Sequence, residues 1–235
     1  MHHVLLDRWS RSASPLHARD PRAKIIVLVV FLVALAITPA ENYLAIGIQA
    51  SLLIAGILIA GLPFFGILAR AMVVLPLSLT FGLMSWLAGE PGRAVALIEK
   101  SYLSTLAVLL VVGTTPLPRL LAGMESLGVP RTLVLVAQFL YRYLFVISEQ
   151  AQHMRVAAAC RQSSRKNRQP RFRAAAGALA VLFARSYQRA EGIHRAMLAR
   201  AFSGQFSPLR SSRFGFLDGL FLAGLSLFLG LTLTL

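Results

Sequence analysis

A run of uncharged, mostly apolar residues from Tyr43 to Gly61 constrains this chain more than any other feature of its sequence. A helix that crosses the hydrocarbon core of a bilayer needs about 20 consecutive apolar residues, and this run has that length. Only 14% of all residues are charged, whereas soluble domains usually carry about 25%. We therefore predict an all-α integral membrane protein, because helices satisfy their own backbone hydrogen bonds in lipid.

Five apolar runs predict about five transmembrane helices. They are residues 25–37, 43–61, 64–88, 94–115 and 214–235. The first is short, and residues 16–24 lead into it at the interface. The third is interrupted by Pro76. The ionisable groups in these runs are few, and each is close enough to a helix end to reach the interface: Arg70, Glu99, Lys100 and Asp218.

Residues 116–213 are strongly basic and separate the fourth predicted span from the fifth. They hold 16 of the 24 Lys and Arg residues and three of the 9 Asp and Glu residues, and so carry +13 of the net charge of +15. Positive charge near span ends marks the cytoplasmic side. We therefore predict a cytoplasmic N-terminal segment (1–24), four membrane helices (25–115), a basic cytoplasmic domain (116–213) and a last membrane helix (214–235). The C-terminus would lie outside the cell (inner) membrane.

Two other apolar runs, 132–148 and 174–187, could be mistaken for spans. If both crossed the bilayer, seven basic residues between them would lie outside, against the positive-inside rule. We interpret them as long helices at or beneath the cytoplasmic face. In the second helix an apolar stripe recurs at three- and four-residue steps, and Glu191 precedes Arg195 by one turn. Upstream, Pro116–Pro118 and Gly128–Pro130 bracket a short amphipathic helix.

Several kinds of chemistry are missing from the sequence. None of the three lysines follows a glycine, so the chain has no phosphate-binding loop of the P-loop ATPases. No Cys/His cluster or H-E-x-x-H motif predicts a zinc site. The one metal-binding hypothesis is that the amino terminus with His2 and His3 binds Cu²⁺ or Ni²⁺. The alternative is that these residues are polar groups at a frayed chain end.

An arginine stands at the predicted end of each long helix. Arg161 follows Cys160 and precedes Gln162, and Arg200 lies between Ala199 and Ala201. In one interpretation these arginines are solvated charges that complement the helix dipole. In the other, each helix end enters a groove on a partner, where the arginine meets a carboxylate. A nucleic-acid partner is not predicted, because Phe172 is the one aromatic residue among the charges of 163–173. Anionic lipid is the alternative ligand of this surface.

Two parts of the sequence resemble the T components of energy-coupling-factor transporters. The first is Pro15-Leu16-His17 followed by Asp20-Pro21-Arg22-Ala23-Lys24, ahead of the first span. The second resembles the CbiQ branch of these components, which serves cobalt uptake and, in relatives, nickel uptake. It comprises Tyr141–Phe145, Glu149, Arg155, Arg185–Tyr187, Arg189–Glu191 and Met197–Ala201.

The resemblance implies a membrane scaffold that is not itself an enzyme. It would couple two CbiO-like ATPase subunits to a CbiM-like substrate-binding subunit, with a small CbiN-like subunit. ATP would be bound by the ATPases and Co²⁺ or Ni²⁺ by another membrane subunit, and this chain would bind no cofactor. The main alternative is a self-sufficient small-solute permease with Arg70 and Glu99 on its pathway.

The resemblance also assigns roles to individual residues. Two coupling helices would each end in an ATPase-docking motif centred on Arg161 or Arg200. Gln162 and Ala201 stand where the family prefers glycine, and Cys160 replaces an alanine. The structural or coupling candidates on these helices are Arg142, Glu149, Arg185, Arg189 and Glu191.

Overall fold

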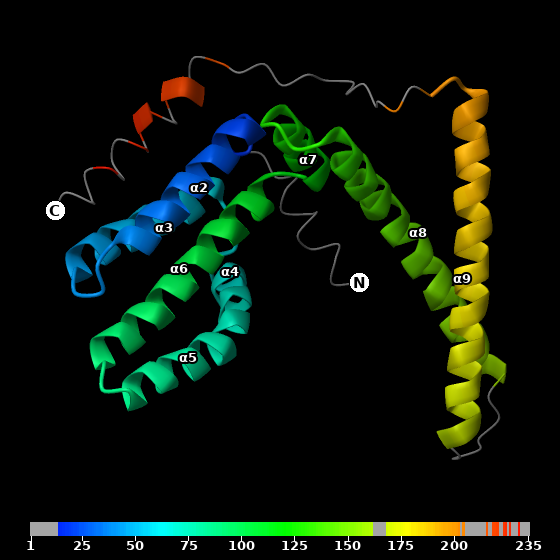
Figure 1. Ribbon diagram of the computed structural model, residues 1–235, viewed down its shortest axis with the longest axis horizontal. Helices are drawn as coiled ribbons and strands as arrows, with labels where there is room; N and C mark the ends of the chain where they lie inside the picture. The colour runs from blue at the N-terminus through cyan, green and yellow to red at the C-terminus, as the bar shows by residue number, and fades with distance from the viewer. Residues whose placement is uncertain are drawn as a thin grey trace. The chain divides into compact units, whose positions relative to one another are not determined.

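The computed structural model describes residues 14–161 and 168–202, and in the C-terminal part residues 204, 215, 218–220, 223–224, 226 and 230. All regular elements within these residues are helical (Figure 1). The chain divides into two compact units: unit 1 is Met1–Gly128 with Leu209–Leu235, and unit 2 is Val129–Pro208. The predicted all-α class is confirmed.

Unit 1 begins with two helices whose ends follow from local sequence. α2 (Pro21–Ile37) starts at Asp20, whose carboxylate accepts a hydrogen bond from the N–H of Arg22 at 2.9 Å. α3 (Tyr43–Ala60) starts at Asn42, whose side chain accepts from the N–H of Ala45. Proline in the first turn of α2 lacks the N–H that would have no partner there.

The next helices also follow the proline pattern. α4 (Phe64–Ala71) leads through the 3₁₀ turn η1 (Met72–Val74) into α5 (Leu75–Leu87), and this change of winding comes just before Pro76. α6 (Pro91–Thr114) and α7 (Leu117–Ser126) complete the unit up to Gly128. The expected short helix between the two proline-containing turns is therefore present as α7.

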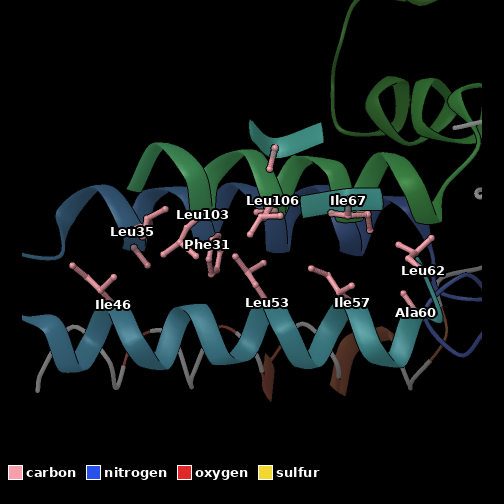
Figure 2. Close-up of a cluster of buried hydrophobic side chains, with 13 residues drawn as sticks. Phe31, Leu35, Ile46, Leu53, Ile57, Ala60, Leu62, Ile67, Leu103 and Leu106 are labelled. Atoms are coloured by element: carbon pink, nitrogen blue, oxygen red, sulfur yellow. The ribbon is translucent and has the colours of Figure 1, made fainter. Parts of the chain in front are cut away.

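α6 organises unit 1, because α2, α3, α4, η1 and α5 all pack against it. The core lies between α2, α3, α4 and α6, and its largest fully buried apolar side chains are Ile57 and Ile67. Figure 2 shows Ile46, Leu53 and Ile57 of α3 pointing toward Phe31, Leu103 and Leu106 on the opposite side of this core. Large apolar side chains also cover the outside, including Phe65, which is 84% exposed. An apolar surface of this kind is suited to contact with the hydrocarbon core of a lipid bilayer.

Four helical stretches are long and apolar enough to cross a membrane among the described residues. Three of them, Tyr43–Ala60, Phe64–Leu87 and Pro91–Thr114, coincide with predicted spans. The first predicted span lies in α2, which has 17 residues and is shorter than these. Most of the last one, 214–235, lies outside the described residues. The fourth stretch, Arg131–Cys160, is one that we assigned to the membrane surface, and its length and composition alone would also permit a span.

Unit 2 consists of two long helices, α8 (Arg131–Arg161) and α9 (Arg168–Ala199). The six residues that connect them, 162–167, lie outside the described part. The last part of α8 lies beside the first part of α9 (Figure 1). A helix rises about 1.5 Å per residue, so that each of these helices is more than 45 Å long.

Candidate partner-docking site on the long helices

Alanines and larger side chains, among them Met154 and Leu182, line the contact between α8 and α9. Ala151 and Ala158 of α8 face Ala174 and Ala178 of α9 across a cavity of about 380 Å³. Alanine allows two helix backbones to approach closely but buries little apolar area on either side. The alanines in this contact therefore add little to the apolar area that it buries.

The predicted docking arginines lie at opposite ends of α9. Arg161 is the last residue of α8, close along the chain to the start of α9, whereas Arg200 follows the last residue of α9. The 32 residues of α9 separate them by a helix of about 48 Å. The structure therefore does not bring the two predicted motifs together, and one partner site could not receive both.

The end of α9 forms a hydrogen-bonded cap that presents Arg200 to solvent. The N–H of Phe202 donates to the carbonyl of Met197 at 3.0 Å, and the N–H of Ala201 donates to that of Leu198 at 3.0 Å. This pair of bonds defines a Schellman motif, in which the residue after the helix is left-handed. Arg200 occupies the capping position, and its side chain is exposed. The backbone here is fixed while the guanidinium is free to meet a partner.

Ala201 occupies the left-handed position of this motif with φ 53°. The same motif ends α3, where the N–H of Leu62 donates to Ile57 and the left-handed residue is Gly61, with φ 64°. A side chain in the left-handed region costs roughly 1–2 kcal/mol. A glycine at position 201 would avoid this cost, whereas Ala201 adopts the left-handed conformation with its side chain present.

The first motif is described only in part. Cys160 is exposed on the last turn of α8, and the backbone of Arg161 ends this helix. The side chain of Arg161 and all of Gln162 lie outside the described residues. The docking role of these three residues stays a prediction.

The coupling candidates on the two helices are exposed rather than joined in one cluster. Arg142 lies 5.9 Å from the ring centre of Tyr143, and Glu149 is exposed about two turns further along α8. Arg185 and Arg189 line a cleft of about 670 Å³ with Gln150 of α8. Glu191 pairs with Arg195 at 3.3 Å, as the one-turn spacing predicted.

The sequence matches the family model of CbiQ, a cobalt transport protein, over residues 12–210. The chain belongs to the CbiQ family. It is 29% identical over 119 residues to the cobalt transport protein CbiQ of Rhodobacter capsulatus, a match that covers 51% of this chain and 48% of that protein. It is also 22% identical over 234 residues to the uncharacterized protein MJ1571 of Methanocaldococcus jannaschii, covering 88% of this chain and 77% of that protein. Together with the apolar helices, the family makes this chain a membrane component of cobalt transport.

Sequence reasoning missed a buried polar cluster at the start of α2 in this CbiQ family member. Lys24 is 3% exposed, and its ammonium group donates to the carbonyl of Thr114 at 3.1 Å and to the hydroxyl of Thr115 at 2.8 Å. Asp218, which was expected to reach the interface, is buried and accepts from the N–H of Asp20 at 3.3 Å. The contacting residues are far apart along the chain, so no local pattern indicates their contact.

The described residues offer little support for a metal site or for a permease pathway. No three His, Cys, Asp or Glu side chains there lie close enough together to hold a metal ion, and His2 and His3 fall outside them. A cavity of about 270 Å³ between α2, α3 and α6 is lined by apolar groups apart from Lys24 and Thr114. Arg70 and Glu99 do not line this cavity, and no observation favours a pathway that uses them.

Proposed function

We propose that this chain is the energy-coupling subunit of an ATP-driven cobalt importer. α8 and α9 would each dock one CbiO-like ATPase subunit through Arg161 and Arg200, and would transmit the ATPase motions to a CbiM-like substrate-binding subunit, with a CbiN-like accessory subunit. Family membership supports cobalt as the transported ion. The metal ligands and the nucleotide site would belong to the partners.

The exposed arginine on the capped end of α9 is the observation that carries the proposal. A fixed backbone end that presents an exposed guanidinium is suited to insertion into a groove, because the backbone loses little conformational freedom on binding. A carboxylate in that groove would accept two parallel hydrogen bonds from the guanidinium. The length of α9 supports two separate ATPase sites, since about 48 Å separates its ends.

Charge supports the orientation of the chain. The segment that carries both arginines also carries most of the net positive charge, which favours the cytoplasmic side, where ATP is available. α8 and α9 would then lie at or beneath the cytoplasmic face of the inner membrane. The N-terminus would be cytoplasmic and the C-terminus outside.

Capture of the ATPase by the detergent-solubilised complex tests the docking role. Removing one arginine of a buried charge pair typically costs about 2–5 kcal/mol of binding. We expect Arg161→Ala and Arg200→Ala each to weaken capture, and the double variant to abolish both capture and cobalt uptake. The double variant Arg168→Ala, Arg171→Ala removes the same charge near the start of α9 and should bind as wild type does. Equal losses in both double variants would mean a diffuse electrostatic surface instead.

The single cysteine tests the orientation without any substitution. Cys160 is exposed beside Arg161. In membranes from cells that lack the ATPase subunits, a membrane-impermeant maleimide should label it in inside-out vesicles and in broken cells but not in intact cells. Labelling from outside in intact cells would contradict the proposed topology and would make α8 a span.

A further inference from the structure

Lys24 joins the start of α2 to the end of α6. Its ammonium group donates to the carbonyl of Thr114 and to the hydroxyl of Thr115, two residues that are 1% and 2% exposed. The last carbonyls of a helix have no partner within that helix, so a buried ammonium group there supplies donors that the backbone lacks. Lys24 therefore closes the end of α6 at the point where the chain turns into α7.

α7 is held against the same end of α2. Its contact face contains Gly123, where an added Cβ would lie 3.1 Å from the Cβ of Pro21 and 3.2 Å from Cδ1 of Ile25. Leu120 and Leu121 of α7 are buried beside it. The segment before α8 is thus fixed in two ways, by the Lys24 bonds at its start and by close packing along its length.

The residues Gly128–Pro130 lie between α7 and α8. The N–H of Gly128 donates to Glu125 at the end of α7, and the N–H groups of Leu133 and Val134 donate to the carbonyl of Pro130 at the start of α8. Gly128 has φ +101°, a value that favours glycine. The division between unit 1 and unit 2 falls between Gly128 and Val129.

We propose that Lys24 and the Gly123 contact anchor α7 to α2, so that movement of α8 is taken up at Gly128–Pro130 and not at the connection between α6 and α7. The inference rests on the proposed function, because it assumes that ATPase movement acts on α8. Hinges are a few residues that absorb a change of backbone angles between rigid parts. Without the anchor, part of that movement would be lost in displacing α7.

The first test measures cobalt uptake and ATP hydrolysis in proteoliposomes that contain the complete complex. We expect Lys24→Met to lower the uptake per ATP hydrolysed by roughly 2- to 30-fold, the range in which single substitutions change coupling. Lys100→Met is the matched control, because Lys100 donates to the carbonyl of Thr38 just past the other end of α2. Lys100→Met should leave the uptake per ATP hydrolysed unchanged. If both variants lowered the uptake per ATP equally, the anchor role of Lys24 would be overturned.

Thr115 separates the hydrogen bond from a general effect on folding. Thr115→Val keeps the side-chain shape but removes the acceptor, and should lower the uptake per ATP hydrolysed. Thr115→Ser keeps the hydroxyl and should leave the uptake per ATP as in the wild type. The effects of Lys24→Met and Thr115→Val should not add, because both remove the same bond. Additive effects, or equal uptake per ATP in the Val and Ser variants, would contradict the assignment.

A distance measurement tests the anchor without the partner subunits. Spin labels replace the exposed residues Val29 of α2 and Met124 of α7 in a Cys160→Ser chain. The distance distribution should be narrow with Lys24, broad in Lys24→Met, and narrow in Lys100→Met. A narrow distribution in Lys24→Met would overturn the anchor. Failure of the wild-type complex to bind ATPase would instead refute the proposed function, and the distances would still test the anchor.

Discussion

The two units of this chain differ in how their helices are stabilised. The core of unit 1 draws buried side chains from four helices, whereas in unit 2 Val134 is the one buried side chain among the described residues. Phe183 of α9, for example, is 75% exposed. The described parts of α8 and α9 therefore gain little stability from burying their side chains against one another. A coupling subunit would gain from this difference, because one part stays rigid while the other rearranges.

The largest expected effect compares a core side chain with an exposed one. Ile57→Ala should destabilise unit 1 by about 2–5 kcal/mol, because it leaves a cavity among fully buried neighbours. Phe183→Ala should change stability by less than about 0.5 kcal/mol in the isolated chain. Reversible unfolding in mixed detergent micelles measures both values. A large cost for Phe183→Ala would mean that unit 2 has a core of its own.

Two glycines offer a second test of the same difference. Gly123→Leu should cost about 1–3 kcal/mol, because its side chain would overlap Pro21 and Ile25. Gly177→Leu on α9 meets open space and should stabilise its helix by up to about 1 kcal/mol through helix propensity. Opposite signs in the unfolding free energies would support the comparison. Two costs of similar size would contradict it.

The two Schellman motifs provide a third test, with opposite substitutions. Gly61→Ala should destabilise the end of α3, and Ala201→Gly should stabilise the end of α9, each by about 1–2 kcal/mol, because alanine is strained at positive φ. Hydrogen exchange of the Phe202 amide measures the second effect. Ala199→Gly, inside the helix, is the control and should accelerate exchange. Slower exchange in Ala199→Gly than in Ala201→Gly would remove the strain argument.

The smallest expected effect concerns the exposed ion pair of α9. Glu191→Gln should weaken the helix by about 0.3–0.5 kcal/mol, and 1 M salt should abolish this difference. Hydrogen exchange of the surrounding α9 amides at low and high salt provides the measurement. A salt-independent loss above about 1 kcal/mol would indicate that Glu191 makes a buried contact in addition to its exposed ion pair with Arg195.

Local sequence rules predicted much of the fold. Pro76 marked the change from α4 to α5, and Gly128 with its neighbouring proline marked the end of α7, because both residues restrict the backbone directly. The spacing of Glu191 and Arg195 predicted their ion pair. These features depend on residues within about one helical turn of each other.

Contacts between distant segments could not be predicted in this way. Lys24 and Thr114 are 90 residues apart, and Asp20 and Asp218 are 198 apart. The sequence placed Asp20 and Lys24 in the N-terminal segment, and Thr114 and Asp218 within predicted spans, and gave no reason to pair them. Arg185 and Arg189 of α9 line a cleft together with Gln150 of α8, and no sequence pattern gave a reason to place these three residues together. That placement depends on how the two helices cross.

The length of α9 gives small rotations a large reach. A rigid rod of about 48 Å that tilts by about 10° about its first turn displaces its far end by roughly 8 Å, close to the width of a helix. Arg200 stands at that far end. A subunit bound there could turn a stroke of several ångströms into a modest change of angle where α9 lies beside α8.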